Sequence, residues 1–187
     1  MARLSLFPTP IGDCGIAWYG DRVVAMSLPE KTSADTTNRL AARTEAIRGD
    51  PPADIRRAIR LITALLKGER PNLSSITCDF SRVDPFAQQV YAVTRAIPAG
   101  ETLTYGDVAS KLGDKQLARR VGQALGRNPV PIIVPCHRVL GANGRLTGFS
   151  APGGIETKRK LLEIEDASIG GTRRLFDHLP ITMKPTQ

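Results

Sequence analysis

The fold is decided by residues 104–139, which read TYGDVASKLGDKQLARRVGQALGRNPVPIIVPCHRV. Thr104 is a favourable N-cap for a helix over 105–112, and Gly113 begins a tight turn before a second helix over 116–127. Helix, short glycine-containing turn and helix is the spacing of a helix-turn-helix motif. The same spacing occurs in an ordinary αα-hairpin inside a core, so the pattern alone leaves both interpretations open.

A thiol stands at the end of this stretch in a restricted segment. Three prolines limit the backbone before Cys136: Pro129, Pro131 and Pro135. Cys136 is followed by His137, and a nearby imidazole is a common means of forming the nucleophilic thiolate. A lone cysteine is otherwise more often a small buried apolar residue. The segment therefore indicates a candidate nucleophile without deciding it.

The chain before this stretch predicts an α/β arrangement. Short apolar runs over 2–28 alternate with turn signals, which is typical of a small antiparallel meander. A polar helix over 32–47 and a helix with one apolar face over 53–68 follow. A short strand over 74–80 then leads into a linker at 81–85.

The charge of the chain is unevenly distributed. The formal net charge is +8 at pH 7 over 187 residues. Residues 1–80 hold 11 Lys and Arg against 9 Asp and Glu, whereas residues 81–187 hold 15 against 9. A polyanionic partner is therefore expected to meet the second half of the chain.

The cysteines and histidines are too scattered for a metal site. The three cysteines show no CxxC spacing, and there are two histidines: Cys14, Cys78, Cys136, His137 and His178. This usage is typical of reduced thiols in a cytosolic protein, without a disulfide framework or a zinc site. No apolar run reaches the length of a membrane span, and the N-terminus does not resemble a secretion signal. We expect a soluble, intracellular protein.

The segment Asn128–Val139 resembles the active-site signature of the O6-alkylguanine-DNA alkyltransferases, also called methylated-DNA–protein-cysteine methyltransferases. The blocks TYGDVA and ARRVGQALGRN upstream and KRKLLEIE downstream stand in the family's order and spacing. The resemblance is strong over 85–166 and looser before it. It implies a ribonuclease H-like α/β domain over 1–80 and a mainly helical winged-helix domain, carrying the helix-turn-helix, over 85–166. Residues 167–187 form an extension of unknown role.

The resemblance also implies a set of catalytic residues. Cys136 matches the alkyl acceptor, His137 the base that removes the thiol proton through a bound water, and Glu165 the carboxylate that holds the imidazole. Neighbours in an extended segment point to opposite sides, which accounts for the water between Cys136 and His137. Tyr105 matches the tyrosine that donates a hydrogen bond to the departing guanine. Lys158 is expected to share a helix face, and the pocket, with Glu165.

A second set of residues is implied to bind DNA. Arg119 matches the arginine that replaces an extruded nucleotide in the base stack. The second helix enters the minor groove, which suits the small residues Ala118 and Gly122. Arg120 either adds a phosphate contact or crowds the groove. Asn128 matches the asparagine that braces the turn between the recognition helix and the cysteine loop.

The expected substrate pocket departs from the family pattern. Val139, Phe149 and Ser150 are expected to line it. Phe149 stands where the family often has tyrosine, so one hydroxyl is missing. The loop over 150–154 is longer than the usual one by about two residues. These two differences leave the range of accepted alkyl groups open.

The expected function is DNA repair by a single irreversible transfer. The substrate is double-stranded DNA containing O6-alkylguanine, chiefly O6-methylguanine, bound through the minor groove and largely without sequence preference. No cofactor and no metal are expected. We expect a monomer in the cytoplasm, associated with the nucleoid when it is bound to DNA, and no membrane partner.

Two other classes of function remain as alternatives. One is a non-catalytic alkyltransferase-like binder or a helix-turn-helix regulator, but binders of that kind replace the acceptor cysteine, whereas Cys136 is present here. The other is a Cys-His hydrolase, which would leave the helix-turn-helix unexplained and lacks an obvious oxyanion hole.

Overall fold

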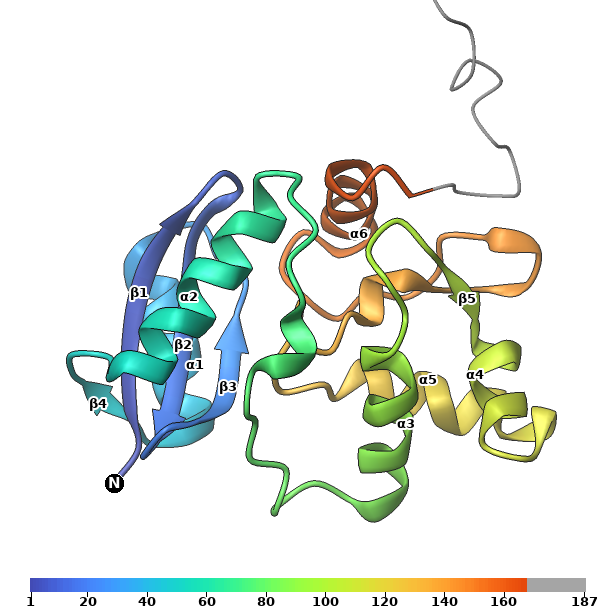
Figure 1. Ribbon diagram of the computed structural model, residues 1–187, viewed down its shortest axis with the longest axis horizontal. Coiled ribbons are helices and arrows are strands. Elements are labelled where there is room, and N and C mark those ends of the chain that lie inside the picture. Colours follow the sequence, from blue (N-terminus) through green and yellow to red (C-terminus); the bar gives the residue numbers. More distant parts are fainter. Residues whose placement is uncertain (168–187) are drawn as a thin grey trace, which may run out of the picture.

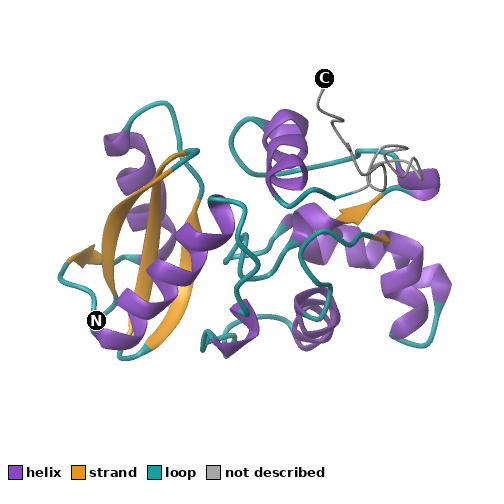
Figure 2. Ribbon diagram, turned by 45° about the horizontal axis from the view of Figure 1, so that its top comes forward, coloured by secondary structure: helices purple, strands orange, loops and turns teal. Residues whose placement is uncertain are grey.

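The computed structural model describes residues 1–167, and the predicted extension over 167–187 lies outside the described residues except for Ala167. A sheet with its helices forms one side of the molecule, and a group of helices and loops forms the other (Figure 1). Figure 2 shows the strands gathered on the sheet side, with one short pair on the helical side. This mixture of sheet and helices confirms the α/β character that the sequence predicts.

A four-stranded mixed sheet forms the N-terminal part. Strands β1 (Arg3–Thr9), β2 (Gly12–Tyr19) and β3 (Arg22–Ser27) pair antiparallel in succession, which confirms the predicted meander. Strand β4 (Ile47–Arg48) pairs parallel to β1, so the order is β3-β2-β1-β4. The expected helix over 32–47 ends earlier, because Glu45 has a left-handed φ of 52° that stops it before β4.

Two helices cover opposite faces of this sheet. Helix α1 (Ser33–Thr44) packs its Leu40 in one cluster with Leu4 and Ala17 of the sheet. Helix α2 (Ala53–Leu66) packs against the other face. That larger cluster includes residues of α2 and alternate residues of β2: Ile55, Ile62, Leu65, Cys14, Ile16 and Trp18. The period-two alternation of β2 thus separates its side chains between two helices.

The strand predicted over 74–80 is wrong. The segment instead makes a 3₁₀ turn, Leu73–Ser75, and one isolated bridge between Cys78 and Val23. Asn72 caps the turn by accepting a hydrogen bond from the backbone N–H of Ser74 at 2.9 Å. A local side-chain hydrogen bond of this kind competes with strand pairing, so only one residue reaches the edge of β3.

The helical part begins with α3 (Pro85–Arg95). Asp84 caps it by accepting from two backbone N–H groups, and Pro85 occupies the first helical position. Helix α4 (Tyr105–Lys111) starts with a capping box between Thr104 and Asp107. The start of α4 is therefore where the sequence predicts it.

Two helices joined by a short turn lie where the sequence predicts a helix-turn-helix, and their assignment to that motif stays a prediction. Gly113 has a φ of +99° in the turn, and a 3₁₀ turn over Lys115–Leu117 leads directly into α5 (Ala118–Gly126). The predicted second helix over 116–127 is thus not one continuous α-helix, because its first residues belong to the tighter 3₁₀ turn. Helices α4 and α5 contact each other, and α5 also contacts α3.

The rest of the helical part supports the cysteine loop. Strand β5 (Leu103–Thr104) pairs parallel with β6 (Val139–Leu140), directly after a 3₁₀ turn over Cys136–Arg138. A further 3₁₀ turn, Ala142–Gly144, precedes helix α6 (Gly154–Ile164).

The two parts share one hydrophobic cluster, and the backbone N–H of Met26 in β3 donates to the carbonyl of Pro129 at 2.8 Å. The division into 1–80 and 85–166 stays a prediction.

Among the described residues no helix is long and apolar enough to cross a membrane.

Candidate active site

The loop before Cys136 folds back on itself. The backbone N–H of Val134 donates to Val130 at 2.9 Å, and that of Cys136 donates to Val134 at 2.8 Å. Ile132 adopts a φ of 73°, a region that branched residues rarely enter and that is strained. Because the surrounding segment is buried, this reversal is held rigidly. The expectation that the loop restricts Cys136 is met by hydrogen bonds as well as by prolines.

Asn128 connects this loop to the thiol. Its Nδ2 donates to the carbonyl of Val134 at 2.8 Å and to Sγ of Cys136 at 3.4 Å, while its Oδ1 accepts from the backbone N–H of Val130 at 3.0 Å. The predicted brace between α5 and the cysteine loop is therefore present in the structure. A role of Asn128 in binding DNA stays a prediction.

The thiol of Cys136 is 9% exposed and its acidity is set by opposing effects. Burial raises the pKa of Cys136 above its usual value, while the hydrogen bond from Asn128 and the charge of Lys158 lower it. The resting form is thus the thiol. The two groups that favour the thiolate already lie beside the sulfur, so they stabilise negative charge once a base removes the proton.

Glu165, at the C-cap of α6, binds two consecutive residues of the Cys136–Arg138 turn. Its Oε1 accepts from Nε2 of His137 at 2.9 Å and from Nη2 of Arg138 at 2.7 Å, and its Oε2 accepts from Nε of Arg138 at 2.8 Å. Arg138 also donates to the carbonyl of Ile97. All three side chains are less than a tenth exposed. The hydrogen bonds from His137 and Arg138 hold the pKa of Glu165 at about 2 against the opposing effect of burial.

His137 is held as a neutral base. Burial lowers the pKa of His137 below its usual value, although the hydrogen bond to Glu165 raises it in part. Because a carboxylate only accepts, Nε2 carries the proton and Nδ1 has the free lone pair. Nδ1 is buried and has no hydrogen-bond partner among the described residues. It is therefore available to accept a proton.

One geometric expectation about this pair is wrong. Cys136 and His137 lie in a 3₁₀ turn and not in an extended segment. Successive side chains in such a turn point about 120° apart. The two side chains still point in different directions, so a bridging water between them is still expected. That water stays a prediction, which now rests on the geometry of the turn.

Lys158 of α6 is the cation whose charge lowers the pKa of Cys136. Its ammonium group donates to the carbonyls of Val139 at 2.6 Å and Thr147 at 3.0 Å, and lies 5.8 Å from the ring centre of Tyr105. Burial lowers the pKa of Lys158 to about 8, so it is mostly a cation at neutral pH. Lys158 and Glu165 come from one helix and its C-cap, but neither lines the cavity over Cys136, so their predicted place in one pocket is not seen in that lining.

The predicted DNA-binding residues separate into two groups. Arg119 is exposed on α5, whereas the guanidinium of Arg120 stacks over the ring of Phe86 at 4.2 Å. Ala118 packs against the core. A side chain added at Gly122 would meet the ring of Tyr105 at 3.7 Å, so α5 passes close to that ring.

A cavity of about 270 Å³ opens over Cys136. Asn128, Phe149 and Ser150 line it with the thiol, in agreement with the predicted pocket for the last two. Val139, Tyr105 and Lys158 are not part of its wall. Helix α1 and the end of β3, on the sheet side of the molecule, complete it with residues that the sequence did not single out: Met26, Ser27, Leu28, Arg39 and Arg43.

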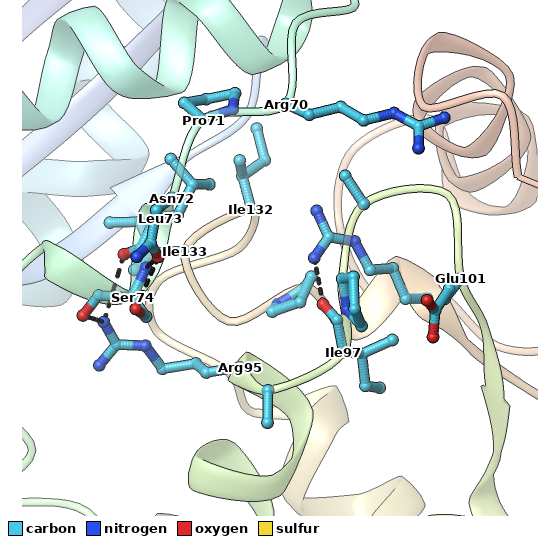
Figure 3. A pocket seen from close by; sticks show the side chains of 15 residues that line it. Arg70, Pro71, Asn72, Leu73, Ser74, Arg95, Ile97, Glu101, Ile132 and Ile133 are labelled. Carbon is cyan, nitrogen blue, oxygen red and sulfur yellow. Dashed lines mark hydrogen bonds between the residues drawn. The ribbon is translucent and has the colours of Figure 1, made fainter.

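A second cavity, of about 440 Å³, lies behind the Cys136–Arg138 turn and does not include the thiol. In Figure 3, Arg70 and Arg95 lie on different sides of it, and Ile97 and Glu101 close a further side. The nucleophile therefore faces the smaller cavity.

Sequence reasoning missed Arg138 and the two arginines of α1. Arg138 adjoins His137 in the chain, so its position was a signal, but its partner, Glu165, lies 27 residues away. Nothing in the local sequence around Arg39 and Arg43 points to the cavity. Among the described residues no three His, Cys, Asp or Glu side chains come together as metal ligands.

Comparisons with known proteins point to one family. The family profile described as "6-O-methylguanine DNA methyltransferase, DNA binding domain" matches residues 85–167. A Mycobacterium tuberculosis protein named methylated-DNA–protein-cysteine methyltransferase is 36% identical over 177 residues, covering 95% of this chain and 100% of the relative. A protein of the same name from Methanothermobacter thermautotrophicus is 33% identical, covering 87% of this chain and 84% of the relative.

Two solved structures extend the likeness to the fold. The crystal structure of Mycobacterium tuberculosis OGT in complex with DNA superposes with a TM-score of 0.73 at 38% identity, covering 88% of this chain and 92% of that chain. An O6-methylguanine-DNA methyltransferase from Pyrococcus kodakaraensis gives 0.61 at 30% identity, covering 88% and 99%. Both likenesses cover most of each of the two chains compared. This chain belongs to the methylated-DNA–protein-cysteine methyltransferase family.

Proposed function

We propose that this protein repairs DNA by moving the alkyl group of O6-alkylguanine, chiefly O6-methylguanine, onto Sγ of Cys136. Direct reversal of alkylation is the activity of its family, and DNA is its partner. The observation that carries the assignment to Cys136 is the surroundings of its thiol. Asn128 donates an amide hydrogen bond to the sulfur, and a neutral His137 in the same turn is held by Glu165. These surroundings favour attack by a thiolate.

The reaction begins with the proton on Sγ. It passes through a bridging water to Nδ1 of His137, and Glu165 stabilises the resulting imidazolium through Nε2. The thiolate lone pair then forms the S–C bond as the C–O6 bond breaks, and the guanine leaves with that electron pair. The guanine takes up the proton, so charge and atoms balance. Tyr105 donates a hydrogen bond to the guanine as negative charge develops on it. The positive charge of Lys158 stabilises the thiolate of Cys136.

The product is a thioether, which water does not cleave at neutral pH. Each molecule therefore acts once, and the reaction needs neither a cofactor nor a metal. Two alternatives are weaker. A non-catalytic binder does not explain a thiol that accepts a hydrogen bond from Asn128, and a Cys-His hydrolase does not explain the helix-turn-helix.

DNA is engaged by α5 through the minor groove, with little dependence on sequence. The O6 substituent is buried in a duplex, so the nucleotide must rotate out of the stack, and Arg119 fills the gap that it leaves. Arg119 is free for this role because it is exposed on α5, whereas the guanidinium of Arg120 rests on Phe86.

We also propose a fold type for each of the two parts. The N-terminal part is ribonuclease H-like, and the helical part is of the winged-helix type, with the β5–β6 pair in place of a larger wing. We further propose that the protein acts as a monomer in the cytoplasm and joins the nucleoid when it binds DNA.

An intact-mass measurement tests the assignment. The protein is incubated with a duplex that contains one O6-methylguanine, and the peptide that carries Cys136 is then mapped. We expect one added methylene group on that peptide and at most one per molecule. Cys136→Ser is the matched control, since it keeps the size of the side chain and should bind the duplex without being alkylated. Methylation at Cys14 or Cys78 in this variant, or binding without any transfer in the wild type, would overturn the proposal.

A further inference from the structure

The cavity over Cys136 has a cationic wall that the transfer reaction does not use. Three arginines line it: Arg39 and Arg43 of α1, and Arg127 at the end of α5. No aspartate or glutamate belongs to the lining. The wall therefore combines charges from both sides of the molecule around one opening.

The two arginines of α1 are held close together with incomplete compensation. Arg39 and Arg43 are one helical turn apart, so their side chains occupy the same face of α1. Arg39 donates to Glu30 at 2.9 Å, whereas the guanidinium of Arg43 forms no hydrogen bond or ion pair with any described residue. Partial burial and the neighbouring charge of Arg39 lower the pKa of Arg43. Like charges at this spacing destabilise the helix slightly, and an anion between them would relieve that repulsion.

Arg127 brings the third charge from the opposite side. It directly precedes Asn128, whose amide contacts the thiol, and Arg127, Asn128 and Cys136 line the same cavity. The neighbouring wall offers no competing carboxylate, because Phe149 is apolar and the hydroxyl of Ser150 donates to the carbonyl of Gly126 at 2.8 Å. An anion entering from this side meets three arginines on the lining, and Glu30, which pairs with Arg39, lies outside that lining.

We propose that this wall is an anion subsite of the alkyl-transfer pocket, which binds a carboxylate or phosphate oxygen beside the reacting guanine. The inference rests on the proposed function and extends it to substrate preference. Two sources supply such an anion. One is a carboxylate on the O6 substituent itself, as in a carboxymethyl adduct, and the other is a backbone phosphate next to the flipped nucleotide. Arginine suits both, because its planar guanidinium binds either anion in a bidentate manner.

Three modified guanines, each supplied in a duplex and as a free base, distinguish a carboxylate on the substrate from a backbone phosphate as the bound anion. Identical duplexes carry O6-methylguanine, O6-carboxymethylguanine or its neutral carbamoylmethyl counterpart, and the three modified bases are also supplied free. Transfer rates are compared for the wild type, for Arg39→Gln with Arg43→Gln, and for Arg60→Gln. Arg60 is exposed on α2, the helix on the other face of the sheet, so the last variant controls for loss of surface charge.

A carboxylate source predicts a specific ratio. The wild type should favour carboxymethyl over carbamoylmethyl in duplex and as free base, and the double variant should reduce that preference about tenfold, which corresponds to one charge-assisted hydrogen bond. Arg60→Gln should keep it. A phosphate source instead predicts equal slowing of all three duplexes, a salt dependence shallower by about one to two phosphate contacts, and unchanged rates on the free bases.

Equal behaviour of the double variant and Arg60→Gln in every comparison would overturn the anion subsite. That failure is distinct from a failure of the proposed function, which would appear as absence of methyl transfer to Cys136 by the wild type from the O6-methylguanine duplex. Because both arginines are exposed, the double variant should fold, and its rate on free O6-methylguanine reports whether the thiol and its base are intact.

Discussion

Glu165 holds His137 through a 2.9 Å hydrogen bond from Nε2, across 28 residues of sequence. The same oxygen accepts from Arg138, so the carboxylate serves a base and a cation at once. Because a salt-bridged carboxylate stays ionised, the imidazole remains oriented with Nδ1 free to take a proton. The alkyl transfer proposed for Cys136 depends on this orientation.

Replacing Glu165 by Gln should destabilise the protein by about 3–5 kcal/mol at pH 7, because Arg138 would become a buried cation without a counter-charge. The pKa of Glu165 lies at about 2, below its usual 4.5. Its stabilising contribution is thus complete above pH 4.5 and is lost as the pH falls through about 2. Denaturant unfolding at several pH values should show the difference between wild type and variant shrinking below pH 4.5. A constant difference would exclude this linkage.

Replacing Arg138 by Met should raise the pKa of His137, because the charge of Arg138 lowers it. Nitrogen NMR of the imidazole reports both the pKa and the protonated nitrogen. A His178→Gln background leaves His137 as the one histidine in the chain. Arg138→Lys keeps a cation and should shift the pKa less than the Met variant. If both variants titrated as the parent does, Arg138 would have no influence on the base.

Replacing Asn128 by Ala should slow reaction of the Cys136 thiol about 10- to 100-fold, because a hydrogen bond to a charged sulfur contributes about 1.5–3 kcal/mol. The same change leaves the carbonyl of Val134 and the N–H of Val130 without their partner, with an expected loss of stability of about 1–3 kcal/mol. Labelling with a small thiol reagent over a range of pH measures the first effect. An Asn128→Ala protein labelled at the wild-type rate would show that the amide does not act on the sulfur.

Arg119→Ala and Arg120→Ala should behave differently. Loss of Arg119 should slow repair in duplex roughly tenfold or more while leaving reaction with free O6-methylguanine unchanged, because extruding a base costs a few kcal/mol. Loss of Arg120 should instead lower stability by about 0.5–1 kcal/mol through its contact with Phe86. Paired transfer assays and thermal unfolding measure both. Equal losses on duplex and free base for Arg119→Ala would exclude its role in base flipping.

Local chemistry accounts for the parts of the fold that the sequence predicted well. The meander, the helix over Ala53–Leu66 and the capped start of α4 at Thr104 depend on near neighbours, turn residues and apolar spacing. The prediction of a strand over 74–80 was wrong because the side chain of Asn72, and not the apolar pattern, determines the local backbone conformation. The 3₁₀ turn at Cys136 was missed because the prolines restrict the chain without specifying a turn.

The sequence by itself determined the candidate nucleophile, its adjacent imidazole and the family to which the chain belongs, because these are features of contiguous residues. Only the tertiary structure decided that Glu165 is shared with Arg138, that Asn128 touches the sulfur, and that Arg39 and Arg43 of α1 line the same cavity. The physical reason is that hydrogen bonds and cavity walls join residues that are distant in the chain. Their partners are set by packing around a common core, which a local pattern does not contain.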